Sequence, residues 1–193
     1  MKRKLINCVK VCSIFLLLTI VCPAMGQDFI IGMKYGYGNT TFTRQSDNRK
    51  TPAYSSHRAS LVAEFSPYYS RLFIISGIEY EIQDLTNSLN IPLTLRIVLG
   101  NTIRPFLEGG GYFTYSLTSQ AEMYTIKNDL GAKISAGLSI HLNKKWRLEA
   151  AYIYYAGFTT ALEEKLLLPL DQYTLEEYRR RSGFATIGIK YRF

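Results

Sequence analysis

Two histidines stand out among the residues that could do chemistry, because imidazole is the side chain whose charge changes near neutral pH. These are His57 and His141, and His57 has Ser55, Ser56 and Asp47 close to it in the chain. A Ser-His-Asp group activates the serine as a nucleophile, so one hypothesis is an enzyme that cleaves or transfers acyl groups with His57 as its base. Nearness in the chain does not supply the required geometry, and a histidine exposed to water in a loop is the favoured interpretation.

A pair of carboxylates offers a second candidate. Glu79 and Glu81 are two residues apart, so on a strand they share one face, and paired carboxylates can divide acid and base roles. General acid-base work also needs a cleft and a path for the substrate. Salt bridges to Arg58, Arg96 or Arg104 are the favoured role. We therefore predict no catalytic residues and no enzymatic activity.

Cysteine and glycine usage argue against cofactor chemistry. All three cysteines, Cys8, Cys12 and Cys22, lie in the first 26 residues, so the rest of the chain can form no disulfide, no Cys-ligated metal site and no Cys nucleophile. The glycine-rich stretches at residues 32–38 and 109–111 open no predicted helix, which leaves no helix N-terminus to bind phosphate. We predict no cofactor and no metal.

The charge balance is less basic than it first looks. The chain has 23 Lys and Arg residues against 15 Asp and Glu residues, a formal net charge of +8. Four of the basic residues (Lys2, Arg3, Lys4 and Lys10) lie in the first 26 residues, which contain no acid. The remainder carries 19 basic and 15 acidic residues, so nucleic acid is not indicated as a partner.

Residues 1–26 have the pattern of a signal peptide. A basic start is followed by an apolar run of 12 residues at 11–22 and by small residues at Ala24 and Gly26, as at a signal-peptidase site. A membrane-spanning helix would need roughly 20 apolar residues. Lipidation of Cys22 is disfavoured because no small residue precedes it. We expect a mature chain, and a single domain, of residues 27–193.

The mature chain alternates apolar with polar or small residues in eight runs bounded by turn-forming residues, which is the pattern of half-buried strands. The runs are residues 29–43, 57–66, 72–83, 89–100, 103–117, 130–142, 146–158 and 184–193. Short connections at 66–71, 100–102 and 143–145 alternate with long ones at 44–56, 118–128 and 159–183, although 84–88 departs from this alternation. Alternating lengths are typical of outer-membrane barrels.

The two faces of these runs differ in kind. One face carries thirteen charged side chains and many glycines. The charged residues are Lys34, Arg58, Glu64, Glu79, Glu81, Arg96, Arg104, Glu108, Lys133, Arg147, Glu149, Lys190 and Arg192. The other face has no charge and is rich in aromatic residues near the strand ends, such as Tyr35, Trp146 and Tyr191. One Arg or Lys on a lipid-facing position at the midplane costs about 2–4 kcal/mol, so the charge-free face is predicted to contact lipid.

The sequence thus predicts an all-β fold, an eight-stranded antiparallel up-and-down transmembrane β-barrel with its charges enclosed. The interior of such a barrel is just wide enough to be filled by side chains, so we expect no wide pore. The alternative, a secreted soluble lipocalin-like binding barrel, would place the apolar face inside and the charges in water.

Four segments resemble a known family: Ser88–Arg96 (SLNIPLTLR), Arg104–Tyr112 (RPFLEGGGY), Asp129–Gly137 (DLGAKISAG) and the ending Gly188–Phe193 (GIKYRF). They are similar to small outer-membrane β-barrel proteins of Bacteroidota, often labelled PorT-like, and the likeness covers essentially the whole mature chain. The resemblance implies a barrel in the cell envelope. It transfers no biochemical activity, although one branch of the family is implicated in protein secretion.

The connection at residues 159–183 is the most individual part of the chain. Thr174 to Glu177 fits a capping box, and Glu176 and Arg180 are four residues apart, so a short helix over the barrel mouth is predicted. The apolar run at residues 166–170 could contact another envelope protein or lipid, although packing on its own barrel is favoured. The run Arg179 to Arg181 could meet lipopolysaccharide phosphates, although simple hydration is favoured.

Together these patterns predict a non-enzymatic protein of the bacterial cell outer membrane, surrounded by outer-membrane lipid. Its predicted role is structural or interactive, as an accessory to an envelope transport or secretion assembly, with residues 159–183 as the contact to an envelope protein partner. Two alternatives stay open: an outer-membrane enzyme that modifies lipid A with His57, and the secreted soluble lipocalin-like barrel.

Overall fold

The computed structural model describes residues 28–66, 71–83, 86–119, 124–168 and 172–193. The predicted signal peptide, residues 1–26, lies outside them. The strands are β1 (Asp28–Arg44), β2 (Tyr54–Ser66), β3 (Leu72–Gln83), β4 (Thr86–Val98), β5 (Ile103–Ser119), β6 (Tyr124–Ile126), β7 (Asp129–His141), β8 (Trp146–Gly157), β9 (Leu162–Leu168) and β10 (Gln172–Arg192). No helix among the described residues has the length and apolar character needed to cross a bilayer.

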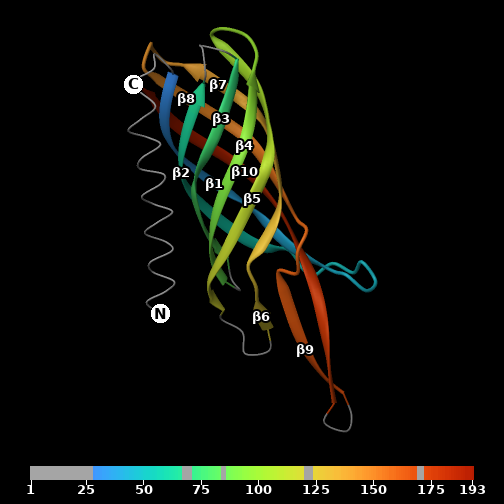
Figure 1. The fold of residues 1–193 in the computed structure, drawn as a ribbon. Helices are drawn as coiled ribbons and strands as arrows, with labels where there is room; N and C mark the ends of the chain where they lie inside the picture. The colour runs from blue at the N-terminus through green and yellow to red at the C-terminus, as the bar shows by residue number, and fades with distance from the viewer. Residues whose placement is uncertain (1–27, 67–70, 84–85, 120–123, 169–171) are drawn as a thin grey trace.

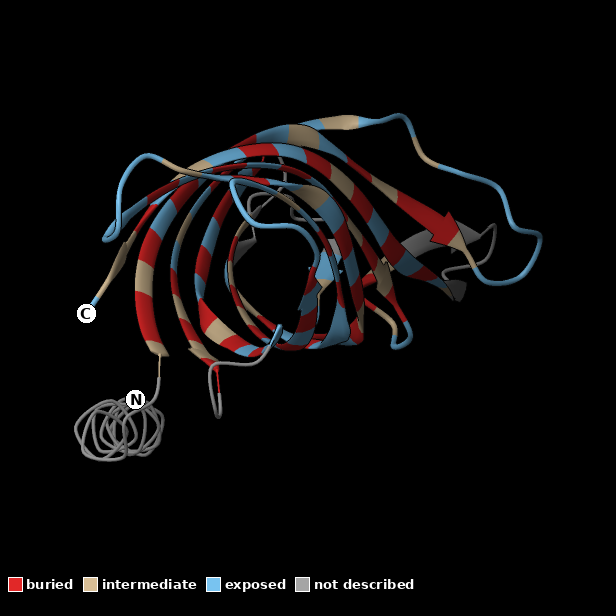
Figure 2. Ribbon diagram, turned by 90° about the horizontal axis from the view of Figure 1, so that it is seen from above, coloured by how far each residue is buried: buried red, intermediate tan, exposed pale blue. Residues whose placement is uncertain are grey.

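Eight of these strands form a closed barrel (Figures 1 and 2). They pair antiparallel in the order β1, β2, β3, β4, β5, β7, β8, β10, and β10 pairs with β1 to complete the circle. Each barrel strand neighbours the one before it, so the topology is up-and-down, and closure leaves no free edge in the wall. The predicted eight-stranded antiparallel barrel is confirmed.

Along most of each strand, the wall alternates between buried side chains and more exposed ones (Figure 2). On β1, Met33 and Tyr35 are 63% and 52% exposed on the outside, whereas Lys34 between them is 6% exposed and points inward. Eleven of the thirteen predicted luminal charges are buried, and Arg104 and Arg192, at the end near the chain termini, are partly buried. The soluble-barrel alternative required the opposite arrangement.

Glycine lets inward-facing side chains and neighbouring strands approach closely. A Cβ atom at Gly131 would lie 2.2 Å from the carbonyl oxygen of Ala156 and 2.7 Å from the ring of Tyr112. Gly131 is paired with Tyr112 across the strands β7 and β5. The missing side chain therefore makes room for a buried aromatic ring in a narrow lumen.

The end of the barrel opposite the chain termini differs from the prediction. β10 begins at Gln172 and runs without a break to Arg192, and it pairs with β9 before it enters the wall. β9 in turn pairs with β6. We call β6, β9 and residues 172–178 of β10 the extracellular sheet, because it projects from the end that lies away from the short turns (Figure 1).

The predicted helix at Thr174–Glu177 is therefore wrong. An i,i+4 ion pair stabilises a helix by only about 0.2–0.5 kcal/mol, and a helix of a few residues is too short to be stable alone. In the strand, residues 172–178 pair with β9 and residues 178–192 pair with β1. Residues 181–191 also pair with β8 on their other side. Leu166 to Leu168 of the predicted apolar contact run belong to β9, and residues 169–170 lie outside the described residues.

Candidate functional site

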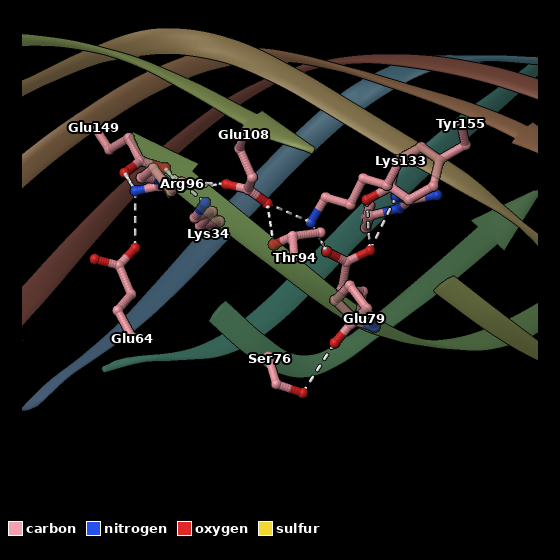
Figure 3. A network of polar contacts seen from close by, with 12 residues as sticks. Lys34, Glu64, Ser76, Glu79, Thr94, Arg96, Glu108, Lys133, Glu149 and Tyr155 are labelled. Atoms are coloured by element: carbon pink, nitrogen blue, oxygen red, sulfur yellow. Dashed lines mark hydrogen bonds and ion pairs between the residues drawn. The ribbon is translucent and has the colours of Figure 1, made fainter. Parts of the chain in front are cut away.

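The middle of the lumen is filled by ion pairs centred on Arg96 of β4 (Figure 3). The Arg96 guanidinium lies 2.8 Å from a carboxylate oxygen of Glu64, 2.6 Å from one of Glu108 and 2.6 Å from one of Glu149. Lys190 bridges Glu64 and Glu149 from the opposite wall. One guanidinium thus gathers carboxylates from three strands, with charge-assisted hydrogen bonds that are about twice as strong as neutral ones.

A second group of ion pairs continues from Glu108 toward the extracellular end. Lys133 Nζ lies 3.2 Å from a Glu108 oxygen and 2.9 Å from a Glu79 oxygen. Arg58 pairs with both Glu79 and Glu81. The predicted salt-bridging role of Glu79 and Glu81 is confirmed for Arg58, whereas Arg96 pairs with other carboxylates.

Arg58 is also held between two aromatic rings. Its guanidinium carbon lies 4.0 Å from the ring centroid of Tyr155 and 4.0 Å from that of Phe184. The Tyr155 hydroxyl donates a hydrogen bond of 2.6 Å to Glu79. Cation–π contacts of this kind are strongest where water is excluded, as it is here, because Arg58 is 1% exposed.

These pairs form one connected group that crosses the lumen. Its members come from all eight barrel strands: Lys34, Arg58, Glu64, Glu79, Glu81, Arg96, Glu108, Lys133, Glu149, Arg180 and Lys190. Six basic and five acidic side chains nearly neutralise one another, as buried charges must. We call this group the luminal ion network.

Burial of the network closes the lumen at this level. Arg58, Arg96, Lys133 and Lys190 are each at most 2% exposed, whereas side chains that line a water-filled channel would be wetted. Toward the periplasmic end the network is followed by an apolar cluster of Ile30, Phe73, Ile75, Val98, Phe106 and Ala151. Glu79 and Glu81 therefore have no open path to a substrate.

Arg180 is a luminal residue that sequence reasoning missed. It pairs with Glu81 in the lumen, whereas Arg179 and Arg181 on either side of it point outward and are exposed. Asp129 was missed as well: it is buried and accepts a hydrogen bond of 2.7 Å from the hydroxyl of Tyr112. Strand alternation extended four residues further on β10 and one on β7 would have found both.

His57 is not assembled into a Ser-His-Asp group. It lies on the outward face of β2, and its Nδ1 atom is 2.6 Å from the Tyr35 hydroxyl. Ser56 points to the opposite side of the wall, where its hydroxyl bonds to Thr40. Asp47 is bound by Arg44 in the connection between β1 and β2. Ser55 shares the outward face with His57, but the structure gives the imidazole no carboxylate partner among the described residues.

The periplasmic rim holds the second histidine. His141 Nε2 lies 3.3 Å from a guanidinium nitrogen of Arg104, and Arg192 pairs with Asp28 at the same rim. Among the described residues, no group of three or more His, Cys, Asp or Glu side chains is arranged to hold a metal ion. The expected absence of a metal and of a cofactor stays a prediction.

The extracellular sheet has a small core of its own. Phe42 of β1, Leu162 of β9 and Tyr178 of β10 are buried together with Ala161, and Tyr54 packs against them. Phe42 is 1% exposed and Leu162 is 2% exposed. This core ties the sheet to the end of the barrel wall, so the sheet is a fixed continuation of β1 and β10.

An ionic cluster lies beside this core. Arg44 donates hydrogen bonds of 2.9 and 2.7 Å to Asp47 and of 2.7 Å to Glu176. These bonds hold the pKa of both carboxyls below their usual values. Burial, together with hydrogen bonds from its hydroxyl to Glu164 and Glu176, raises the pKa of Tyr178 above its usual value.

Comparisons with known proteins bear on the fold. No family model and no curated protein matches the sequence. Neisserial surface protein A (NspA) superposes with a TM-score of 0.57 at 13% identity, and the match covers 86% of this chain and 97% of that one. The chain has the fold of bacterial outer-membrane β-barrel proteins.

Two further solved structures share this barrel. OprG of Pseudomonas aeruginosa matches with a TM-score of 0.53 at 14% identity, covering 86% of this chain and 96% of that one. The N-terminal β-barrel domain of OprF from the same species matches with a TM-score of 0.53 at 11% identity, covering 83% and 97%. The fold agrees with the outer-membrane location predicted from the sequence, and identities this low show the fold alone.

Proposed function

We propose that this protein is a non-enzymatic outer-membrane barrel that holds the extracellular sheet in a fixed position for contact with another envelope protein. One observation carries the proposal: β10 is a single strand of 21 residues that belongs to both the barrel wall and the sheet. A strand of about 9–11 residues is enough to cross a bilayer, so β10 is longer than crossing requires, and its residues 172–178 build the projection.

The edge of β9 supports contact with a partner strand. β6 pairs with β9 only at Leu162 to Glu164, so residues 165–168 of β9 have a described neighbour, β10, on one side only. An edge strand presents unpaired backbone N–H and C=O groups, which are a template for an added strand. We propose that the partner binds along this edge.

The luminal ion network supports a role without transport through the barrel itself. The buried guanidinium of Arg96 and the ammonium groups of Lys133 and Lys190 occupy the lumen. The wild-type protein in a planar lipid bilayer is expected to give no steady ionic current. An accessory role in a transport or secretion assembly fits this closed barrel and the resemblance of Ser88–Arg96 and Arg104–Tyr112 to PorT-like proteins.

Site-specific photo-cross-linking in native outer membranes tests the proposed contact. A photoreactive amino acid at Leu167, on the single-sided part of β9, is expected to capture one protein partner, identified by mass spectrometry. The matched control places the same group at Leu138, which is 49% exposed on the lipid-facing side of β7. Capture of no protein at 167, or of the same set of proteins at both positions, contradicts the proposal.

A further inference from the structure

The outward face of β10 changes from apolar to basic within a few residues. Ile189, Ile187 and Ala185 are exposed and apolar, and the next charged residues on this face are Arg181 and Arg179. The first charges on the outward face mark the place where the surrounding solvent changes from lipid to water.

The length of the strand places this level at the outer surface of the bilayer. Arg181 is ten residues along β10 from Tyr191, which packs edge-on against Trp146 at the opposite rim. At roughly 3.3 Å per residue and a tilt of about 40°, ten residues rise about 25 Å, the height of the apolar band of such barrels. The two guanidinium groups therefore lie at the headgroups of the outer leaflet.

A cavity lies beside the two arginines. Its volume is about 330 Å³, and its lining includes Thr43, Gln45, Asn48, Phe158, Arg179 and Arg181. Phe158 is 59% exposed, and just below this level Tyr152 is 60% exposed. The Tyr152 ring lies over Gly183, where a Cβ atom would be 2.3 Å from its hydroxyl oxygen. Aromatic groups below and cationic groups above match the two halves of a lipid molecule.

Within the described part of the chain, neither Arg179 nor Arg181 has a carboxylate partner. Their neighbours differ: Arg180 pairs with Glu81, and Arg44 pairs with Asp47 and Glu176. Two guanidinium groups on one strand face are spaced to receive the oxygens of one phosphate group, which arginine binds through parallel hydrogen bonds. The described residues thus provide two cations without a carboxylate partner among them, an adjoining cavity, and apolar groups just below.

We propose that Arg179 and Arg181 bind a phosphate group of an outer-leaflet glycolipid, whose acyl chains pack on Tyr152 and the apolar wall below. The proposal rests on the outer-membrane setting of the proposed function, but it does not depend on the protein partner of β9. It names a lipid and not a free anion, because the exposed side chains on the bilayer side of the two arginines, Tyr152 and Ile187 among them, are apolar.

The test measures binding of lipid A to the full-length mature protein, folded in a maltoside detergent that contains no phosphate. Lipid A with both phosphates and lipid A from which they have been removed are titrated, and binding is followed by native mass spectrometry. We expect the phosphorylated form to bind about tenfold more tightly or better. Equal affinity for the two forms would overturn the proposal.

Two double variants separate the site from general charge. R179Q/R181Q is expected to lose the preference for phosphorylated lipid A, by about tenfold or more. R49Q/K50Q also removes two positive charges, but from the neighbouring exposed connection. Its preference for phosphorylated lipid A is expected to stay within about twofold of the wild-type preference. An equal loss in both variants would overturn the assignment to Arg179 and Arg181.

The third measurement adds inorganic phosphate to the protein with lipid A bound. At millimolar concentration it is expected to leave bound lipid A in place, and full displacement would show that the site takes a free anion. Heat-modifiable gel migration checks that each variant is folded, which is expected because both arginines are exposed. A failure here leaves the capture of a protein partner at β9 unaffected, so the two proposals fail separately.

Discussion

The barrel wall and the extracellular sheet share strand β10, and their outward faces differ. On the described wall strands the outward face carries no charge, whereas Arg179 and Arg181 lie on the outward face where the sheet begins. In the wall, Lys34 of β1 is buried and Tyr35 is exposed. Nearer the extracellular end of the same strand, Phe42 points to the same inward side as Lys34. It is also buried, but it is apolar. The backbone conformation is the same in both regions, so strand formation does not decide which face carries charge. The surrounding medium decides it, because hydrocarbon tolerates no charge on its side and water does.

The two regions also differ in how their interiors are stabilised. The lumen is held by the luminal ion network, in which each carboxylate contacts at least two basic groups. The sheet is held by a few apolar side chains and a more exposed ionic cluster around Arg44. Loss of one charge should therefore cost more in the lumen than any single polar change costs in the sheet.

The largest effect is expected for Arg96→Ala. The change leaves Glu64, Glu108 and Glu149 buried without their shared guanidinium, and removing one partner of a buried ion pair costs about 3–5 kcal/mol. Urea unfolding of the protein in lipid vesicles, followed by the fluorescence of the single tryptophan, Trp146, measures this loss.

The control for Arg96 is Arg49→Ala, in the exposed connection between β1 and β2. Arg49 pairs with Asp47 at the surface, and the loss of such an exposed pair should change the free energy of unfolding by no more than about 1 kcal/mol. Equal effects of the two variants would contradict the difference drawn between the lumen and the extracellular end.

A new charge on the outward face tests the lipid-facing half of the comparison. Leu93→Arg places a guanidinium at a residue that is 65% exposed on β4, and we expect a loss of about 2–4 kcal/mol of folding free energy in vesicles. Asn39→Arg, on the outward face of β1 near its extracellular end, should cost only about 0–1 kcal/mol. Similar costs at both positions would show that the outward face is not in lipid.

The barrel wall was predictable from the sequence, because burial on one face and lipid on the other impose a strict period of two. Charged residues at every second position, Glu79 and Glu81 among them, identified the luminal side of the strands before any contact was known. The paired positions of Arg58 and Arg96 were not predictable in detail, since the distance between strands in space depends on the barrel register. Sequence spacing alone does not set that register.

The extracellular sheet was not predictable by the same means. Thr174, Glu176 and Arg180 carry local helix signals, whereas the pairing of β10 with β9 and of β10 with β1 brings together residues far apart in the chain. Tertiary pairing of this kind overrides local preference. The supposed Ser-His-Asp group around His57 does not form for two reasons. Ser56 points to the opposite face of the strand, and Asp47 is bound by Arg44 and not by His57.

A smaller effect is expected for Tyr178→Phe in the extracellular sheet. The variant keeps the buried ring but removes the hydroxyl that donates hydrogen bonds of 2.8 and 3.1 Å to Glu164 and Glu176. We expect the sheet to open more readily by about 1 kcal/mol, while the barrel stays folded. Amide hydrogen exchange of β9 and of residues 172–178 measures the opening.

Tyr54→Phe is the matched control, because Tyr54 packs against the same core and its hydroxyl has no hydrogen-bond partner among the described residues. In Tyr54→Phe, the backbone amides of the extracellular sheet should exchange at the wild-type rate. A faster exchange of the barrel strands in Tyr178→Phe would contradict a separate extracellular unit, since it would mean that the sheet and the wall open together.

The smallest effect is a dependence of the extracellular sheet on pH through the ionic cluster around Arg44. Arg44 lowers the pKa of Asp47 and of Glu176 in the folded protein, so both carboxylates stabilise the folded sheet at pH values above their ordinary pKa of about 4. This contribution is lost as the pH falls below about 4 and through the lower folded values. Hydrogen exchange corrected for the intrinsic rate should therefore show the connection at residues 44–49 and the start of β10 loosening as the pH falls below about 4. Arg44→Gln should weaken this pH dependence, because Arg44 is the largest cause of both lowered pKa values, whereas the hydrogen bonds from Arg49 and Tyr178 remain. A sheet that loosens equally in Arg44→Gln and in wild type would locate the pH response elsewhere than in this cluster.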